Sequence, residues 1–365
     1  MKLEKVKIIG SERASSCFFR SIVAPPFRKA IVKITDRCNL HCAHCFVSAG
    51  RQGELMGLRS VEQSLVPRLK QCRVVSATLT GGEPFAHPEL IEIVRMFRQA
   101  DISVGICSNG VDITTAQMSI LRGLGDVHVN VSLDGFSPES HGRFRGDENS
   151  FYATIRNAKF LAEFGLLQGF LSTPNCLAKP AEYGELCQFA VQSAAKYVLM
   201  NPLSSFGRGV RAKPALAASR TDMEEIKAVT SKYSTALDVV HIRFPNKSHP
   251  LSACQAGNII YVFTNGEVTI CPYLVFAAET PQSRYQRGDF IVGNVFDNDD
   301  IASRLDKYRF EERYTPGDNP TCRVCPMSSK CGKGCPAAVI AAGKCLGDLD
   351  EEVCPVSASQ SVHQE

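Results

Sequence analysis

The chain has 365 residues, enough for one large domain or two ordinary ones, and its 44% apolar and 21% charged residues exclude wholesale disorder. Its net charge of +4 is small and evenly spread, which excludes a nucleic-acid platform, and no apolar run reaches the roughly 18 residues of a membrane span. Residues 1–7 alternate in charge and lack the apolar core of a signal peptide, so we expect a soluble cytoplasmic protein.

Short β-rich runs alternate with amphipathic helical stretches over the first two thirds of the chain. The predicted strands are Ile31–Thr35, Ser76–Thr80, Ser103–Cys107, Val127–Leu133, Gly169–Thr173 and Tyr197–Met200. The predicted helices are Ser60–Gln71, Pro88–Gln99, Thr115–Leu124, Ser150–Phe164, Ala181–Ala195 and Thr221–Ser234. Six strand–helix repeats predict an α/β fold with a parallel sheet and outer helices, either doubly wound or a partial (β/α)6 TIM-like barrel.

Four distinctive motifs follow four of these strands directly. They are Cys38–Cys45, Gly81-Gly82-Glu83-Pro84, Ser108-Asn109-Gly110 and Asp134-Gly135, after the first to fourth strands in that order. In parallel α/β folds the chemistry lies at the carboxyl ends of the strands. The common placement of the motifs therefore supports the predicted fold and indicates one site.

The pattern changes after about residue 245. Ile259–Phe263 and Glu267–Ile270 flank Asn265-Gly266, a strong hairpin signal that should bring Cys254 and Cys271 within reach of each other. Beyond the hairpin we expect a loop-like segment with little apolar core, ordered by metal. The predicted division is an N-terminal segment 1–28, a barrel 29–240, an auxiliary domain 241–355 and a disordered tail 356–365.

Sixteen cysteines are an unusual number for a cytosolic chain, where disulfides are disfavoured and closely spaced cysteines indicate metal or cluster ligands. Five isolated ones, Cys17, Cys72, Cys107, Cys176 and Cys187, are predicted to be small buried hydrophobes. Cys345 fits no pattern and is expected to be structural.

Cys38, Cys42 and Cys45 form a Cys-x3-Cys-x2-Cys motif. Three thiolates can hold one face of a [4Fe–4S] cluster and leave the fourth iron for a substrate, whereas ferredoxin-like carriers use four cysteines per cluster. The alternative is a zinc site that takes a distant fourth ligand.

The run Arg37–Cys45 resembles the defining motif of the radical S-adenosylmethionine (radical SAM) enzymes, and the similarity extends over about residues 29–355. The resemblance implies a cluster whose open iron chelates S-adenosylmethionine (SAM) and a 5′-deoxyadenosyl radical formed on reduction. Gly81-Gly82-Glu83-Pro84 is similar to the family's second-strand motif, which implies that Gly82 and Glu83 hold the methionine ammonium.

The resemblance implies further contacts with SAM. They are His44 against the adenine, and Ser108, Asn109, Ser132 and Asp134 along the ribose and carboxylate. Arg145, in a run typical of one large branch of the family, is assigned to the carboxylate or to a structural role. Asn201 and the following Gly207-Arg208-Gly209 resemble the sixth-strand segment of that branch, or form an ordinary basic loop.

The C-terminal cysteines match the seven-cysteine pattern of the SPASM extension, which implies two auxiliary iron–sulfur clusters. The outer set is Cys322, Cys325, Cys331 and Cys354, and the inner set is Cys254, Cys271 and Cys335. A further cysteine that some relatives carry before the position of Cys254 is absent here, which leaves an open site, a smaller cluster or a ligand such as His249. Pro272-Tyr273 replaces the Asp of the sulfatase-maturating branch, which argues against formylglycine formation.

We therefore expect a radical SAM oxidoreductase or maturase that abstracts hydrogen, most simply from a ribosomally made peptide. The alternatives are a dehydrogenase or decarboxylase of a tetrapyrrole or amino sugar, and, more distantly, a non-catalytic iron–sulfur electron carrier. The expected partners are an external electron donor such as flavodoxin or ferredoxin, with no nucleic acid and no membrane. Only about 30 residues precede the first strand, too few for a fused leader-peptide module, so a separate leader-binding protein or direct docking is expected.

Overall fold

The structure is a computed structural model that describes residues 4–5, 21–23, 25–254, 256–257 and 259–356. Cys17, most of the predicted N-terminal segment and residues 357–365 of the predicted tail lie outside this part of the chain. The described strands are β1 Glu4–Lys5, β2 Ser21–Ile22, β3 Arg28–Thr35, β4 Val74–Gly81, β5 Ser103–Ser108, β6 Val127–Ser132, β7 Leu167–Ser172, β8 Tyr197–Met200, β9 Asp238–His241, β10 Ile259–Val262, β11 Glu267–Thr269 and β12 Gly293–Asn294.

Ten of these strands form one sheet, in the order β12-β11-β10-β3-β4-β5-β6-β7-β8-β9. All six predicted strands are present as β3 to β8 and pair in parallel, each with the next along the chain. The predicted hairpin is also present, as antiparallel β10 and β11. The parallel α/β sheet of a partial barrel is confirmed.

Two further parallel strands extend the six-stranded sheet: β9, which was not predicted, and β10, which was predicted only as a strand of the hairpin. β9 adds to β8 at one edge, and β10 adds to β3 at the other. Since β10 lies far from β3 in sequence, the sheet runs without a break across the predicted boundary between residues 240 and 241.

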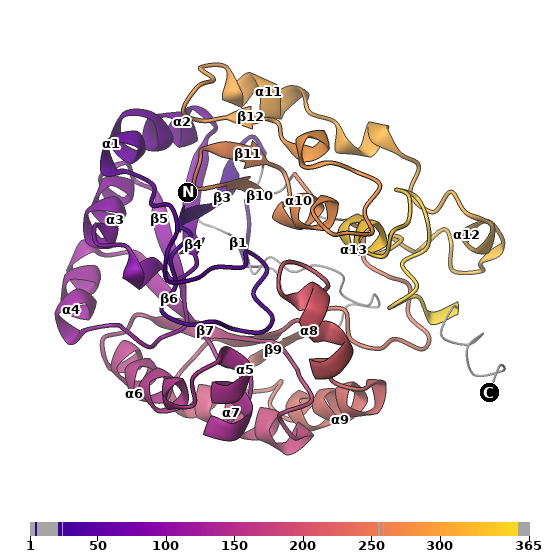
Figure 1. Ribbon diagram of the computed structural model, residues 1–365, viewed down its shortest axis with the longest axis horizontal. Helices are drawn as coiled ribbons and strands as arrows, with labels where there is room; N and C mark the ends of the chain where they lie inside the picture. Colours follow the sequence, from indigo (N-terminus) through magenta and orange to yellow (C-terminus); the bar gives the residue numbers. More distant parts are fainter. Residues whose placement is uncertain (1–3, 6–20, 24, 255, 258, 357–365) are drawn as a thin grey trace.

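The helices fall into two groups (Figure 1). The first group comprises α1 Leu58–Ser60, the π-helical turn η1 Val61–Leu65, α2 Val66–Gln71, α3 Leu90–Gln99, α4 Thr115–Leu124, η3 Pro138–Gly142, α5 Arg143–Arg145, α6 Asn149–Glu163, α7 Pro180–Gln192, α8 Gly209–Leu216 and α9 Arg220–Ser231. A 3-10 turn at Pro84–Ala86 lies between β4 and α3 in this group. The second group comprises α10 Pro272–Ala278, α11 Ile301–Lys307, α12 Pro320–Val324 and α13 Pro336–Ala341, with 3-10 turns at Arg287–Phe290 and Phe310–Arg313. Figure 1 shows α1 to α4, α6 and α7 along the outer side of the curved sheet, with α10, α12 and α13 across from them.

All six predicted helices are present: α4 has the predicted ends, and the other five have shifted ends. Capping explains two of the starts: Thr114 and Gln117 form a reciprocal capping box at α4, and Ser219 and Asp222 form another at α9. The predicted helix 60–71 is divided by the π-helical turn η1, which alternation of apolar residues does not reveal.

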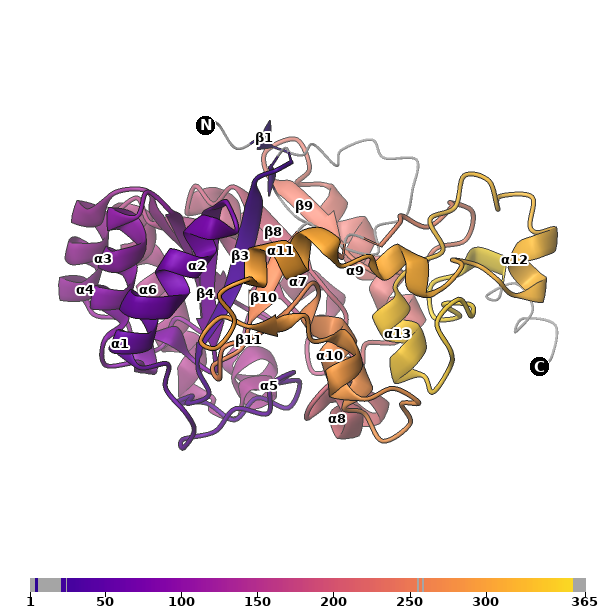
Figure 2. The same ribbon diagram turned by 90° about the horizontal axis from the view of Figure 1, so that it is seen from above.

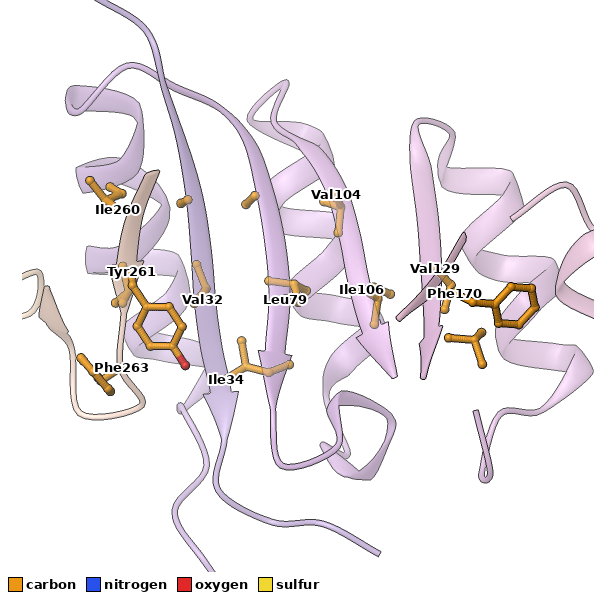
Figure 3. Packing of buried hydrophobic residues seen from close by; sticks show 14 of the residues in the cluster. Val32, Ile34, Leu79, Val104, Ile106, Val129, Phe170, Ile260, Tyr261 and Phe263 are labelled. Carbon is orange, nitrogen blue, oxygen red and sulfur yellow. The ribbon is translucent and has the colours of Figure 1, made fainter. Parts of the chain in front are cut away.

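The strands place alternate residues in two different environments. Positions such as Val32, Leu79 and Val129 are fully buried in the hydrophobic core (Figure 3). The intervening positions, such as Thr78 and Asn130, face the inside of the partial barrel and line a cavity. Period-two alternation of a strand therefore separates the hydrophobic core from the site.

The segment after the hairpin is more ordered than predicted. It forms four α-helices, and residues such as Leu274, Phe290, Ile301 and Ile340 belong to the main hydrophobic core. The prediction of a loop-like segment with little core was wrong because these apolar residues are spread over short helices with no long amphipathic period. No helix in the described ranges is long and apolar enough to cross a bilayer.

Candidate functional site

A cavity of about 940 Å³ lies inside the curved sheet and extends to the carboxyl ends of the parallel strands. Its lining includes the inward-facing residues of the strands, the motif loops after β3 to β6, the segment after β8, and residues of α10 and α13. Figure 2 shows α10 and α13 beside the barrel strands, on the side away from α3 and α4. The cavity is at the end of the sheet where parallel folds carry their chemistry, and its size suits a cofactor together with part of a substrate.

The loop after β3 carries the three motif cysteines, and all three line the cavity. Cys38 and Cys42 are buried, whereas Cys45 is partly exposed. The backbone N–H of Cys38 donates to the carbonyl of Gly50 at 2.7 Å, and the N–H of Leu40 donates to the Cys38 sulfur at 3.4 Å. The loop is therefore closed on itself with its thiols turned inward.

Burial raises the pKa of Cys38 to about 12, so this thiol is protonated at neutral pH without a metal. Metal coordination is the usual way in which buried cysteines become thiolates. In the described part of the chain no group of His, Cys, Asp and Glu side chains is arranged around a single metal ion. The three cysteines fit an iron–sulfur cluster better, because each thiolate of a cluster binds a different iron.

The Gly82-Glu83 turn lies against this loop. A Cβ atom at Gly82 would lie 2.2 Å from the carbonyl oxygen of Arg37, so only glycine permits the approach. Gly82 lines the cavity. Glu83 lies beneath it, 1% exposed.

The Glu83 carboxylate accepts hydrogen bonds from Ser108 Oγ at 2.8 Å, Asn109 N at 2.7 Å and Phe85 N at 3.1 Å. Burial raises its pKa to about 7, although these bonds favour the charged form. Glu83 therefore organises the ends of β4 and β5 and places a titratable negative charge under the cavity. Ser108 and Asn109, both buried, also line the cavity.

Asp134, at the end of β6, forms the most deeply buried ion pair of the site. Arg145 Nε donates to Asp134 Oδ2 at 2.7 Å, and the N–H of Thr173 donates to Asp134 Oδ1 at 2.8 Å. Burial alone would raise the pKa of Asp134, but Arg145 and the nearby histidines hold it below its ordinary value. Arg145 has four other N–H groups with which it can bind an anion in the cavity.

His44 stacks on Phe144 with ring centroids 4.4 Å apart and planes at 6°. Burial lowers the pKa of His44 to about 4, so the ring is neutral at physiological pH. Its Nδ1 is buried without a hydrogen-bond partner. A neutral aromatic ring at the cavity wall, with an unsatisfied ring nitrogen, fits the expected contact with a heterocycle. Ser132, the last residue of β6, lines the same cavity.

Cys254, Cys271 and Cys335, the inner auxiliary set, line the same cavity from its other side. Cys271 immediately precedes α10, and Cys335 immediately precedes α13. His249 is exposed and does not line this cavity. The inner auxiliary cysteines and the motif cysteines therefore line one cavity, and His249 is not among the residues that line it.

Cys322, Cys325, Cys331 and Cys354, the outer auxiliary set, line a second, smaller pocket. The N–H groups of Leu251 and Lys333 each donate to the Cys331 sulfur at 3.4 Å. Such N–H···S bonds are suited to a thiolate ligand. The two auxiliary sets thus lie in different pockets, although their cysteines interleave in the sequence.

The isolated cysteines divide into three kinds. Cys72 and Cys187 are fully buried, as predicted. Cys176 is exposed and Cys107 lines the cavity, so the prediction of a buried hydrophobic role was wrong for these two. Cys107 lies on the inner face of β5 because it alternates with the buried Ile106, a register that can be read from the strand pattern.

Two charged groups and an aromatic cluster at the cavity were not identified as site residues from the sequence. Arg208 contacts the cysteine loop, and Arg243 pairs with the buried Asp350. Phe206 stacks on Tyr273 at 5.6 Å and 15°, with Phe46 edge-on to both. The basic run around Arg208 was visible in the sequence, whereas the other contacts join distant segments and leave no local pattern.

Comparison with known proteins gives a consistent result. Residues 32–175 match the family model "Radical SAM superfamily". The chain is 27% identical over 320 residues to the antilisterial bacteriocin subtilosin biosynthesis protein AlbA of Bacillus subtilis, covering 84% of this chain and 66% of AlbA. It is 26% identical over 333 residues to the mycofactocin maturase MftC of Mycobacterium ulcerans, covering 88% and 86%.

Solved structures agree on the fold. Streptococcus suis SuiB bound to S-adenosylmethionine matches with a TM-score of 0.68 at 17% identity, over 89% of this chain and 77% of SuiB. Native anSMEcpe with bound AdoMet and the Cp18Cys peptide matches with a TM-score of 0.67 at 17% identity, over 93% of this chain and 95% of anSMEcpe.

Proposed function

Because this chain carries a radical SAM domain and is an enzyme of that family, we propose that it modifies a ribosomally made peptide by abstracting hydrogen from it. The observation that supports this most directly is the shared cavity. The motif cysteines, the polar ends of β4 to β6 and the inner auxiliary cysteines all face it. A substrate placed there lies between the source of the radical and a group able to accept an electron.

Radical SAM enzymes use a [4Fe–4S] cluster and SAM, and the bound cluster supplies the electron that cleaves SAM to a 5′-deoxyadenosyl radical. Cys38, Cys42 and Cys45 would hold that cluster, and the SPASM cysteines would hold the auxiliary ones. Gly82 permits the turn to pack closely against the cysteine loop, and Glu83 would place negative charge near the methionine ammonium. Arg145, fixed by Asp134, offers its remaining donors to the carboxylate.

Two features of the cavity suit a peptide. One wall is polar, at the ends of β4 to β6, and another carries Phe46, Phe206 and Tyr273. The aromatic wall can exclude water from the radical and contact an apolar side chain. The relatives point the same way: one is a bacteriocin biosynthesis protein, others are maturases, and SuiB has been solved bound to its precursor peptide SuiA.

The test uses the reduced enzyme, SAM and candidate precursor peptides without oxygen, and measures peptide mass and 5′-deoxyadenosine. Expected is a mass change that depends on SAM and on an electron donor such as flavodoxin or ferredoxin, with or without a separate leader-binding protein. Unchanged peptide mass, with 5′-deoxyadenosine formation stimulated instead by a tetrapyrrole or amino sugar, would support the small-molecule alternative. Iron–sulfur content without any SAM cleavage would indicate an electron carrier.

A further inference from the structure

The segment between β8 and α8, residues 201–208, folds back onto the loop that carries the motif cysteines. Its last residue, Arg208, makes three hydrogen bonds to that loop. Arg208 N donates to the carbonyl of Cys45 at 3.0 Å, Nε to that of Cys42 at 2.8 Å, and Nη1 to that of Ala49 at 2.6 Å. One residue thus fixes three carbonyls spread along the cysteine loop.

Gly207 makes this approach sterically feasible. Its φ is +52°, a left-handed conformation that favours glycine. A Cβ atom would lie 2.3 Å from the carbonyl oxygen of Phe46 and 2.5 Å from that of Cys45. Gly207 and Arg208 therefore work together, since the glycine allows contact and the arginine supplies the donors.

The guanidinium is suited to this position by its shape and by its charge. Its planar fork reaches two carbonyls at once, which the single ammonium of a lysine cannot do in the same geometry. It also places a permanent positive charge beside Cys42, in a loop whose cysteines would become thiolates on binding a cluster. A positive charge favours the reduced and more negative state of an iron–sulfur cluster, and cluster charge is one determinant of its potential.

Resting on the proposed function, we propose that Arg208 is a positioning residue for the catalytic cluster, one that fixes the cysteine loop and raises the reduction potential of the cluster it holds. Its neighbour Phe206 stacks on Tyr273, two residues after Cys271. The same segment therefore also joins the cysteine loop to the wall that carries the inner auxiliary cysteines.

The test compares Arg208→Gln and Arg208→Lys with Arg211→Gln, in which an exposed arginine on the next turn of α8 is replaced. Full-length proteins are reconstituted without oxygen, and iron content is measured. Electron paramagnetic resonance is recorded during a redox titration with and without SAM, because the part of the signal that changes with SAM reports the catalytic cluster alone.

We expect Arg208→Gln to shift the SAM-sensitive signal to lower potential and to weaken SAM binding by at least threefold. Arg208→Lys keeps the charge and should keep the potential, and both variants should hold less iron in the catalytic cluster because each has lost the fork. Arg211→Gln should match the wild type in every measurement. If Arg208→Gln does not fold, Gly207→Ala, which forces the segments apart while keeping the guanidinium, replaces it and should give the same downward shift.

An unshifted potential in Arg208→Gln, or in its Gly207→Ala replacement, overturns the inference. If the wild type itself shows no SAM-sensitive signal, the proposed function and this inference fail together. If the wild type shows the signal and cleaves SAM while the variants match it, the inference alone fails.

Discussion

Glu83 is a motif residue that lies beneath the cavity and does not line it. Its carboxylate accepts three hydrogen bonds from neutral donors and lies under the surface that Gly82 forms. We expect Glu83 to act on SAM binding through its charge and through the positions of Ser108 and Asn109.

Substitution Glu83→Gln should weaken SAM binding roughly tenfold, or about 1.4 kcal/mol, with iron content unchanged. The negative charge is lost, and the new amide group donates where the carboxylate accepted. The measurement is the SAM dissociation constant of the reconstituted protein by anaerobic calorimetry. Glu62→Gln, at an exposed position, is the control. An unaltered constant would remove Glu83 from the site.

A pH dependence follows from the raised pKa of Glu83, about 7 against an ordinary 4.5. The ionised form binds an ammonium, so SAM affinity should increase from pH 6 to pH 8, and Glu83→Gln should lose this increase. Folding stability should follow the opposite trend. The contribution of Glu83 is fully present below its ordinary pKa and is lost as pH rises through about 7. A pH-independent SAM affinity in the wild type would contradict the assignment.

The motif cysteines give a sharper test. Replacing Cys38, Cys42 and Cys45 together by Ala should remove about four iron atoms per chain, one [4Fe–4S] cluster, and abolish SAM cleavage. The auxiliary cysteines line other walls or a separate pocket, so their iron should remain. The matched control is Cys72→Ala together with Cys187→Ala, both buried in the hydrophobic core and away from the two cysteine pockets. Retained SAM cleavage in the triple variant would refute the motif assignment.

At the scale of elements, a buried ion pair joins the end of β9 to the segment after α13. Arg243 Nη1 donates to Asp350 Oδ2 at 2.5 Å, and Asp350 Oδ2 also accepts from the N–H of Cys335 at 3.0 Å. The side chains are 10% and 2% exposed. Asp350 therefore couples the position of an inner auxiliary cysteine to the barrel edge.

Asp350→Ala should destabilise the protein by about 1.5–3 kcal/mol, because the buried Arg243 guanidinium loses one of its two carboxylate partners and keeps only Glu352. Urea unfolding of the reconstituted protein measures this. Lys247→Ala, which breaks an exposed pair with Glu224, should cause no measurable change. If Asp350→Ala and Lys247→Ala lowered the free energy of unfolding equally, burial would not explain the contribution of the Arg243–Asp350 pair to stability.

For the whole molecule, the continuous sheet means that the barrel and the auxiliary region support each other. β10 pairs with β3 along Ile259–Val262, and residues of α10 and α13 belong to the same core as the barrel strands. The proposed division at residues 240 and 241 therefore marks a change of sequence pattern within a single sheet.

Three clusters per chain should give about 10–12 iron atoms after anaerobic reconstitution. Iron analysis with protein quantified by amino-acid analysis provides the measurement. Near eight iron atoms would indicate that one auxiliary set does not hold a cluster, and near four would leave only one set filled. Cys331→Ala, in the separate outer pocket, should lower the count without changing SAM binding.

The sequence by itself determined the six central strands, their helices and the placement of the motifs at the strand ends. These depend on local alternation, capping and turn residues, as in β5 and α4, and such interactions lie within a few positions of each other. The cysteine spacing likewise indicated cluster ligands, because spacing is a local property.

Only the tertiary structure decided which distant groups meet. The pairing of β10 with β3, the contact of Arg208 with the cysteine loop and the ion pair of Arg243 with Asp350 join residues far apart in the chain. These three contacts depend on complementary surfaces and on the free energy of burying charges or strand edges. Such long-range interactions produce no periodic pattern in the sequence. The short C-terminal helices were missed for the same reason, since packing against the barrel rather than their own periodicity stabilises them.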